Sequence, residues 1–256
     1  MPANLISCRP ASYGEFASDA YRHLPKIGIH NVEIAVPAAD QWTELAGELK
    51  KNELNVSSVA GGIDLSKNDE VANFEQVARG AQRLGAKIIF LSVKSGGVPL
   101  QQCYGKLRGM GDVAKNFGAT IALETHPDLV TNGETAVATM KGTDHPNVRL
   151  NYDSANLYYY NEGVDGIAEL KKFLPYLGAV HLKETNGRYK TWYFPGLHEG
   201  DGNVDFPAIF ALCNQAGFFG PFTIEIEGIE GETLSREQAC ARIENSVKYL
   251  KSIGAM

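Results

Sequence analysis

The stretch VANFEQVARGAQRLGAKIIFLSV (residues 71–93) contains both kinds of element that decide the fold. Apolar residues recur at helical spacing from Val71 to Leu84, and Gly85 follows where a helix would end. Residues 87–93 then form a nearly continuous apolar run. Such a run is typical of a strand in a parallel sheet buried on both faces, whereas a half-exposed strand would alternate. The stretch therefore predicts a helix that leads into a buried parallel strand.

Eight strand-like runs of this kind occur along the chain, with helical patterns between them. Alternating β and α units favour a parallel sheet with right-handed crossovers, and eight units favour closure into a barrel. The length of 256 residues suits such a barrel, and no linker-like stretch interrupts the series. We therefore predict one α/β domain over residues 1–256, a (β/α)8 or TIM barrel. The predicted strands span residues 4–8, 32–36, 54–60, 87–93, 120–124, 148–153, 179–183 and 222–227.

An open nucleotide-binding sheet is the alternative fold for alternating β and α units. That fold requires a glycine-rich turn after an early strand. The segment at the end of the first predicted strand, SCRPASYGEF (residues 7–16), has no GxGxxG pattern. The doublets at residues 61–62 and 96–97 do not open helices in that pattern either, and we predict that both doublets form turns.

Composition and charge narrow the function. The formal net charge of −6 would repel a phosphate backbone, and no cluster of lysine and arginine offsets it, so nucleic-acid binding is not expected. The amino terminus has no charged region followed by a long apolar run, and no stretch is apolar enough to span a membrane. We predict a cytoplasmic protein. Its four cysteines are widely spaced without a CxxC pair, which predicts reduced thiols at Cys8, Cys103, Cys213 and Cys240.

Four consecutive predicted strands end in polar residues. Because barrels of this type build their active sites at the carboxyl ends of the strands, these residues are the candidate site. One such residue alone often caps a helix or is a hydrogen-bonded core residue. Three carboxylates that meet at a barrel mouth, however, repel one another unless a cation neutralises them. The predicted ligands of one metal ion are Glu124, Asp153, His181 and Glu225.

The type of ligand narrows the choice of metal. Two glutamates, an aspartate and a histidine make a hard, mostly oxygen donor set. This set suits Mn²⁺, Mg²⁺ or Co²⁺ and is also compatible with Zn²⁺. We predict one divalent ion as the cofactor.

Strand periodicity extends the candidate site, because residues two apart point the same way. His126, Lys183 and Glu227 each stand two positions after a predicted ligand and would project beside it if the strand continues. The alternative for these three is a solvated loop residue or a salt bridge at the barrel rim.

The loop over residues 184–203 carries three consecutive aromatic residues at 192–194, which can stack on a sugar ring or only cover the barrel. His198 in the same loop could reach a substrate. No compact glycine-rich cradle for phosphate follows the eighth predicted strand, so we expect an unphosphorylated small molecule. The tyrosine run at residues 158–160 is an apolar loop patch typical of a lid or a subunit contact, and it predicts a homo-oligomer.

Over almost its whole length the chain resembles the xylose isomerase-like barrels, which include ketose 3-epimerases, hydroxypyruvate isomerases, inosose dehydratases and zinc AP endonucleases. The resemblance maps the family's metal ligands onto Glu124, Asp153, His181 and Glu225. The segment HEGDGNVDFPAIF (residues 198–210) is similar to the family's GxGxxDF stretch. The segments that carry the ligands are YGKLRGMGDVAKNFGATIALETHP (104–127), NYDSANLY (151–158), VHLKETNGR (180–188) and FTIEIEG (222–228).

The resemblance also implies roles. In the ketose epimerases the two metal-bound glutamates act as acid and base, which maps onto Glu124 and Glu225. An arginine after the metal histidine binds sugar hydroxyls there, and Arg188 is the nearest match, with an offset that differs by one residue. Where those epimerases have a substrate-binding histidine, this chain has Asn156, which can bond a hydroxyl but cannot hold a proton at neutral pH. The predicted substrate-binding residues are His126, Asn156, Lys183, Arg188 and His198.

These features predict a metal-dependent isomerase or epimerase of a keto-sugar, which transfers a proton through an enediolate. One alternative is a lyase or dehydratase that acts on a keto-sugar, keto-glycoside or cyclitol through the same enolate, with Lys183 or His198 as its acid. Another is a sugar-binding barrel without catalysis. An AP endonuclease would need more histidine and aspartate ligands and a basic DNA face, which this acidic chain lacks.

Overall fold

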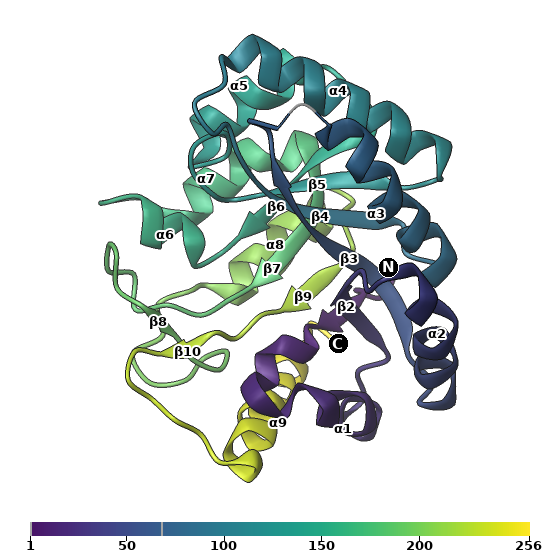
Figure 1. Cartoon of the computed structure of the whole chain (residues 1–256). Helices are drawn as coiled ribbons and strands as arrows, with labels where there is room; N and C mark the ends of the chain where they lie inside the picture. Colours follow the sequence, from purple (N-terminus) through teal and green to yellow (C-terminus); the bar gives the residue numbers. More distant parts are fainter. Residues whose placement is uncertain (1, 68) are drawn as a thin grey trace.

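The computed structural model describes residues 2–67 and 69–256, and eight parallel strands within them close into a barrel (Figure 1). Closure occurs where β9 pairs with β1, in register at Phe222 and Ile6, and with β7 on its other side. All eight predicted strands are present, which confirms the predicted fold. In barrel order they are β1 (Ile6–Cys8), β2 (Asn31–Ala35), β3 (Asn55–Asp64), β4 (Ile88–Lys94), β5 (Thr120–Glu124), β6 (Val148–Asp153), β7 (Leu177–Leu182) and β9 (Phe222–Ile224).

Helices surround the barrel and pack on one another around it, α3 on α4, α4 on α5, α5 on α7, and the last helix α9 on the first helix α1. Three short 3-10 segments are η1 (Pro10–Asp19), η2 (Ala39–Gln41) and η3 (Leu174–Tyr176). The α-helices are α1 (Ala20–Ile27), α2 (Trp42–Lys51), α3 (Glu70–Leu84), α4 (Leu100–Asn116), α5 (Gly133–Thr143), α6 (Asn156–Tyr160), α7 (Gly166–Phe173), α8 (Phe206–Gln215) and α9 (Arg236–Ser252).

The unit formed by α3 and β4 shows how the sequence pattern becomes structure. Phe74, Ala78 and Ala81 form the buried face of α3. The helix ends at Gly85, whose φ of 80° lies in the left-handed region that glycine adopts without steric cost. The strand that follows is buried at most positions, as expected for a sheet covered on both faces.

The two glycine doublets have different roles. Gly96 and Gly97 form the predicted turn, with positive φ at both residues. The prediction for residues 61–62 is wrong, because Gly61 and Gly62 lie inside β3 and pair with β4. A Cβ at Gly61 would lie 3.0 Å from the Leu91 side chain, so this glycine permits close packing inside the sheet.

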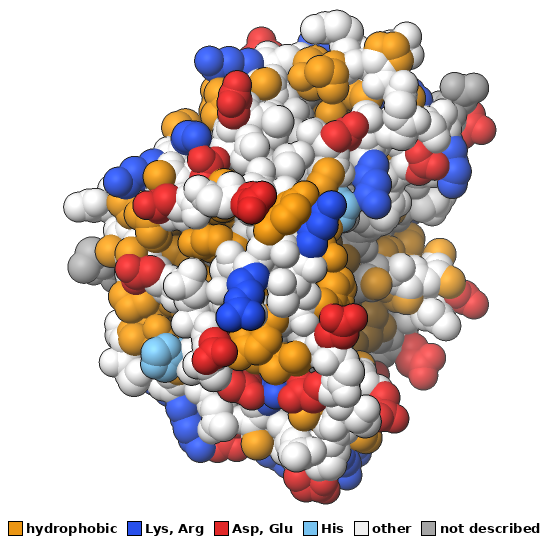
Figure 2. Space-filling model, turned by 90° about the vertical axis from the view of Figure 1, so that its left-hand side faces the viewer, with side chains coloured by type: hydrophobic (Ala, Val, Ile, Leu, Met, Phe, Trp, Pro, Cys, Tyr) orange, Lys and Arg blue, Asp and Glu red, His pale blue; other side chains and the backbone are white. Residues whose placement is uncertain are grey.

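A small antiparallel pair of strands, β8 (Tyr193–Phe194) and β10 (Gly228–Ile229), lies at the carboxyl ends of the barrel strands (Figure 1). The loop that leads to β8 and on to α8 is organised by the buried carboxylate of Glu184, which accepts hydrogen bonds from backbone N–H groups of Thr185, His198, Asn203 and Val204. Gly202 is required there because a Cβ would lie 2.6 Å from that carboxyl group. The face that carries this loop is hollowed, with hydrophobic and acidic side chains beside the hollow (Figure 2).

The tyrosine run does not form the predicted loop. Residues 156–160 are the short helix α6, and all three tyrosines are partly buried. The Tyr158 hydroxyl accepts a hydrogen bond from the N–H of Gly166, and Tyr160 contacts His126. These tyrosines therefore pack within the chain instead of forming a free apolar patch.

The cysteines and the membrane prediction can be compared with the structure directly. All four cysteines are free, as predicted, with Cys8, Cys103 and Cys213 buried and Cys240 partly exposed. Within the described residues, no helix combines the length and apolar character that crossing a bilayer requires.

Candidate metal centre and active site

The four predicted ligands come together at the barrel mouth. Glu124 and Asp153 are the last residues of β5 and β6, His181 lies one residue before the end of β7, and Glu225 follows β9 directly. One ligand atom from each residue lies within 4.8 Å of the other three, and all four side chains are buried. The convergence follows from the fold, because parallel barrel strands all end at the same rim.

The donor atoms of this cluster suit a cation. His181 Nδ1 lies 2.7 Å from Glu225 Oε2, 3.6 Å from Glu124 Oε1 and 3.8 Å from Asp153 Oδ2. Despite these short distances, the buried atoms His181 Nδ1, Asp153 Oδ2 and Glu225 Oε2 do not meet any group of the described residues with hydrogen-bond geometry. Buried polar atoms without partners are costly, and a bound ion is one of the standard explanations for them.

His181 is oriented by a residue that the sequence analysis did not identify. Its Nε2 lies 3.1 Å from Glu33 Oε1 in β2, and an ionised carboxylate only accepts, so Nε2 carries the proton. The second oxygen of Glu33 accepts a 2.6 Å hydrogen bond from the Ser58 hydroxyl. This arrangement turns Nδ1 toward the cluster, as in carboxylate–histidine–metal triads. The sequence signal was present, because Glu33 is the single charge in the apolar run VEIAV.

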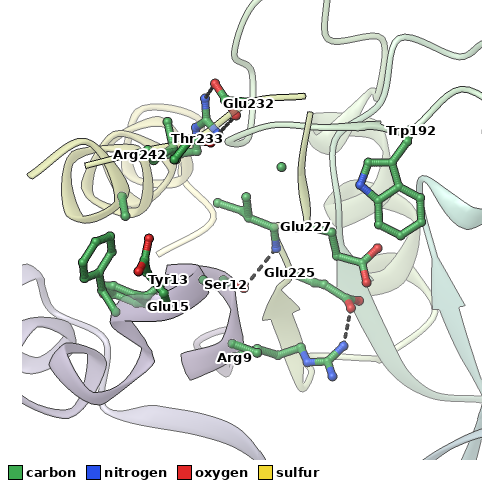
Figure 3. Close-up of a pocket in the computed structure, with 17 residues that line it drawn as sticks. Arg9, Ser12, Tyr13, Glu15, Trp192, Glu225, Glu227, Glu232, Thr233 and Arg242 are labelled. Carbon is green, nitrogen blue, oxygen red and sulfur yellow. Dashed lines mark hydrogen bonds and ion pairs between the residues drawn. The ribbon is translucent and has the colours of Figure 1, made fainter. Parts of the chain in front are cut away.

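Arg9, the first residue after β1, also was not predicted. Its guanidinium forms an ion pair with the Glu225 carboxylate (Figure 3). Its Nε also lies 3.5 Å from Glu33 Oε1. The same group lies over the Phe90 ring, 5.6 Å from its centroid. Arg9 therefore supplies positive charge beside the ligand cluster from the end of β1, the same kind of strand-end position that the four ligands occupy.

In the metal-free protein, the surroundings of Glu124 and Glu225 shift the pKa values of these two carboxyl groups in opposite directions. Burial raises the pKa of Glu124 to about 7. Burial also disfavours the ionised form of Glu225, but the positive charges of Lys183 and His181 outweigh it and hold the pKa of Glu225 well below its usual range. One carboxyl group is therefore suited to hold a proton and the other to accept one.

The ring of His181 responds to the same charges. Burial alone would lower its pKa, but the carboxylates of Glu33 and Glu225 hold the pKa of His181 well above its ordinary value. In the metal-free protein a proton on this ring partly neutralises the carboxylates. A cation bound at Nδ1 would displace that proton, as metal binding to histidine generally does.

Two predicted substrate-binding residues form a chain beside Glu124. Asn156 Nδ2 donates to Glu124 Oε1 at 3.3 Å, and its Oδ1 accepts from Lys183 Nζ at 3.1 Å. Lys183 is buried, forms an ion pair with Glu227, and lies 4.4 Å above the centroid of the Phe194 ring. The ammonium group of Lys183 and the amide group of Asn156 are therefore held in fixed positions beside the cluster.

A cavity of about 290 Å³ opens beside the cluster. Three of the predicted substrate-binding residues, His126, Asn156 and Lys183, line it. His126 Nε2 accepts from the Tyr160 hydroxyl at 2.9 Å and its Nδ1 donates to the Pro127 carbonyl, which fixes the ring. The aromatic part of the wall is formed by Phe90, Tyr159, Tyr160, Trp192 and Phe194.

Two predicted substrate-binding residues are not part of this cavity wall. Arg188 is exposed, outside the residues that line the cavity. His198 stacks on Tyr249 of α9, with ring centroids 4.5 Å apart, and is held there by the bond from its N–H to Glu184. Because the backbone of this loop is bonded to Glu184, the side chains of Arg188 and His198 lie outside the cavity wall. Arg9 provides the guanidinium at the site.

The sequence matches the family described as xylose isomerase-like TIM barrel over residues 22–253. L-ribulose-5-phosphate 3-epimerase from Salmonella paratyphi C (strain RKS4594) is 31% identical over 133 residues, which cover 51% of this chain and 44% of that protein. The chain thus spans under half the length of this relative.

Solved structures share the fold. D-psicose 3-epimerase from Clostridium cellulolyticum H10, a structure with D-tagatose, has a TM-score of 0.79 at 15% identity, over 97% of this chain and 98% of that chain. A probable 3-DHS dehydratase, AsbF, from Bacillus anthracis has a TM-score of 0.71 at 18% identity, over 96% and 98%. At such low sequence identities the similarity shows a shared fold and does not show a shared activity.

Proposed function

Because the chain belongs to the xylose isomerase-like TIM barrel family, we propose that it is a divalent-metal-dependent isomerase or epimerase of a keto-sugar. The observation that carries the proposal is the group of four buried residues whose possible metal-ligand atoms converge at the barrel mouth. Three of these residues, Asp153, His181 and Glu225, each have a buried polar atom that forms no hydrogen bond there. The sugar epimerases among its relatives support the same reaction class.

In this proposal Glu124, Asp153, His181 and Glu225 hold the ion, and the oxygen-rich donor set favours Mn²⁺, Mg²⁺ or Co²⁺. When bound, the ion supplies positive charge that makes the hydrogen beside a substrate carbonyl more acidic. Glu33 and Ser58 keep the ligand histidine in its orientation.

Glu225 and Glu124 move the proton. Glu225 accepts the carbon-bound proton at a carboxylate oxygen, and Glu124 delivers a proton from its own carboxyl group. In the metal-free protein the pKa values of the two groups are already separated in this direction. The two groups come from β5 and β9, which β6 and β7 separate in the barrel. Delivery to the same carbon from the other side gives an epimer, and delivery to the neighbouring carbon gives an isomer.

The remaining wall residues hold the sugar. Asn156 and His126 can bond hydroxyls, and Lys183 places a positive charge beside the oxygen on which negative charge develops. Tyr159, Trp192 and Phe194 form an aromatic surface that excludes water and packs on a sugar ring.

The experiment is incubation of the Mn²⁺-loaded protein in D₂O with a panel of ketoses and aldoses, followed by NMR. We expect deuterium at the carbon beside the carbonyl, together with an epimer or isomer. Full metal loading without deuterium uptake from any sugar would contradict the proposal.

An elimination reaction is the second candidate, and the fold shared with the probable dehydratase AsbF favours including it. Its first step is the same proton removal, so the same spectra decide between the two. Loss of a hydroxyl or glycosyl group from the deuterated sugar would identify a lyase, and full retention of all substituents would identify an isomerase or epimerase.

A further inference from the structure

A second cavity, of about 470 Å³, adjoins the catalytic one. The residues that line the second cavity are drawn in Figure 3. It lies between η1 on one side and the segment from the end of β9 to α9 on the other. The two cavities share Arg9, Trp192, Glu225 and Glu227 in their walls. A molecule bound at the metal cluster can therefore extend past Glu225 and Trp192 into the second cavity.

The catalytic cavity, at about 290 Å³, lies at the lower end of the roughly 300–1,000 Å³ of typical small-molecule pockets. With the second cavity of about 470 Å³ joined to it, the space lies well inside that range. The two cavities together therefore offer room for a group beyond the one at the metal cluster.

The charges of the walls argue against a phosphate in this space. The three Lys and Arg side chains that line the two cavities already pair with carboxylates, Arg9 with Glu225, Lys183 with Glu227, and Arg242 with Glu232 and Glu199. An anion would have to take one of these cations from its partner and leave a carboxylate uncompensated, which is unfavourable. Glu15 adds a further negative charge to the wall (Figure 3).

The second cavity instead suits an uncharged ring that carries hydroxyls. Trp192, which is 41% exposed, and Phe16 offer aromatic surface for a ring face. The side chains of Glu15 and Glu227 end in carboxylates, which can accept hydrogen bonds from the hydroxyl groups of such a ring. Thr233 lies on the opposite wall from Trp192 (Figure 3).

We propose that the second cavity is a substrate subsite for an uncharged glycosyl group attached to the keto-sugar, so that the preferred substrate is a keto-glycoside rather than a free or phosphorylated ketose. The proposal rests on the proposed function, because the sugar that reacts must lie at the metal cluster. The glycosyl group contributes binding energy remote from the reacting carbon, and such energy can raise turnover as well as affinity.

The test measures kcat/KM for deuterium exchange by the Mn²⁺-loaded protein with D-fructose, D-fructose 6-phosphate, and the glucosyl-fructoses turanose, maltulose, leucrose and isomaltulose. These disaccharides differ only in linkage, so they sample the directions in which the second ring can leave the first. At least one of them should exceed both D-fructose and its phosphate by about tenfold or more, the change that about 1.4 kcal/mol of extra binding produces. A phosphate ester that is the best substrate, or equal values for all compounds, would overturn the proposal.

Variants at Thr233 separate the subsite from the reaction. Thr233→Trp would fill the cavity, and Thr233→Val is the matched control that keeps the size of the side chain. We expect the ratio of kcat/KM for the best disaccharide to that for D-fructose to fall about tenfold in the tryptophan variant and to hold in the valine variant. An unchanged ratio in both variants would refute the subsite.

A binding measurement distinguishes the failure of this proposal from the failure of the proposed function. Calorimetric titration of the Mn²⁺-loaded protein with the four disaccharides reports the subsite without turnover. Binding that Thr233→Trp abolishes, without deuterium exchange, would support the subsite and refute the reaction. Exchange with D-fructose but no preferential binding of any disaccharide would support the reaction and refute the subsite.

Discussion

The two halves of the barrel mouth contribute different parts of the same site. The second half, from β5 to β9, supplies the four side chains whose donor atoms converge. The first half, from β1 to β3, supplies Arg9 and Glu33, which contact the ligands Glu225 and His181, and Ser58, which bonds Glu33. The comparison teaches that groups from both halves compensate the buried acids, because Arg9 follows β1, which pairs with β9 beside Glu225, and Lys183 follows β7 within the second half. We expect changes at Glu124 and Glu225 in the second half to affect proton transfer, and changes in the first half to weaken metal binding without removing a ligand.

The largest effect should come from the second half. Glu124→Gln and Glu225→Gln each remove a carboxyl group that transfers a proton, and such groups contribute about 10²–10⁴-fold to rate. We expect a loss of that size in kcat for deuterium exchange, measured by NMR at saturating Mn²⁺. Near-normal turnover in both variants with metal bound would break the assignment.

Removal of the metal should affect the stability of the whole mouth. An ion that binds only the folded chain stabilises it by about 2.7 kcal/mol when free metal is a hundred times the dissociation constant. Without the ion, the converging carboxylates are compensated only by protein groups. We expect chelation to lower the urea midpoint, with recovery on addition of Mn²⁺. Identical unfolding curves with and without metal would argue against a site.

The first half should respond with a graded change in metal affinity. Glu33→Gln keeps the size of the side chain but weakens its bond to His181 Nε2, and loss of such outer partners typically costs about 10–100-fold in metal affinity. Ser58→Ala, which removes only the bond to Glu33, should cost less. Calorimetric titration with Mn²⁺ measures both. Glu134→Gln on the exposed surface of α5 is the control, and equal affinities in all three variants would contradict the supporting role.

The smallest effect concerns the pair of Glu232 and Arg242, which lines the second cavity but contacts none of the four ligands. Hydrogen bonds from Arg242 lower the pKa of Glu232 below its usual value. This stabilisation is present above the unfolded pKa of about 4.3 and is lost as pH falls through the lower folded value. We expect Glu232→Gln to cost about 1 kcal/mol or less in urea unfolding at pH 7, and progressively less as pH falls through the lowered folded pKa of Glu232. A loss of unfolding free energy in Glu232→Gln that increases as the pH falls would contradict the stabilising pair with Arg242.

The same comparison explains what could be predicted from sequence. The eight apolar runs identify the strands because a parallel sheet buried on both faces needs them. Glu124, Asp153, His181 and Glu225 could be found because each stands at a strand end and all strand ends of a barrel meet. Glu33 could not be distinguished from an isolated charge, because its partner His181 lies 148 positions away in the sequence.

Other misses have equally local causes. The positions of the Arg188 and His198 side chains depend on the course of a long loop. Glu184 fixes that course through hydrogen bonds from backbone N–H groups, and no sequence pattern predicts these bonds. The prediction for Gly61 failed because glycine serves both turns and close packing, and only the position of Leu91 distinguishes them.

The central claim is that four residues from four strand ends form one metal site. Its most direct test is calorimetric titration of chelator-treated protein with Mn²⁺, compared with Asp153→Asn, which replaces a buried ligand by a side chain of the same shape. The account predicts one saturable site per chain in the unmodified protein and a loss of that site in the variant. No saturable binding, or the same stoichiometry and affinity in both proteins, would contradict it.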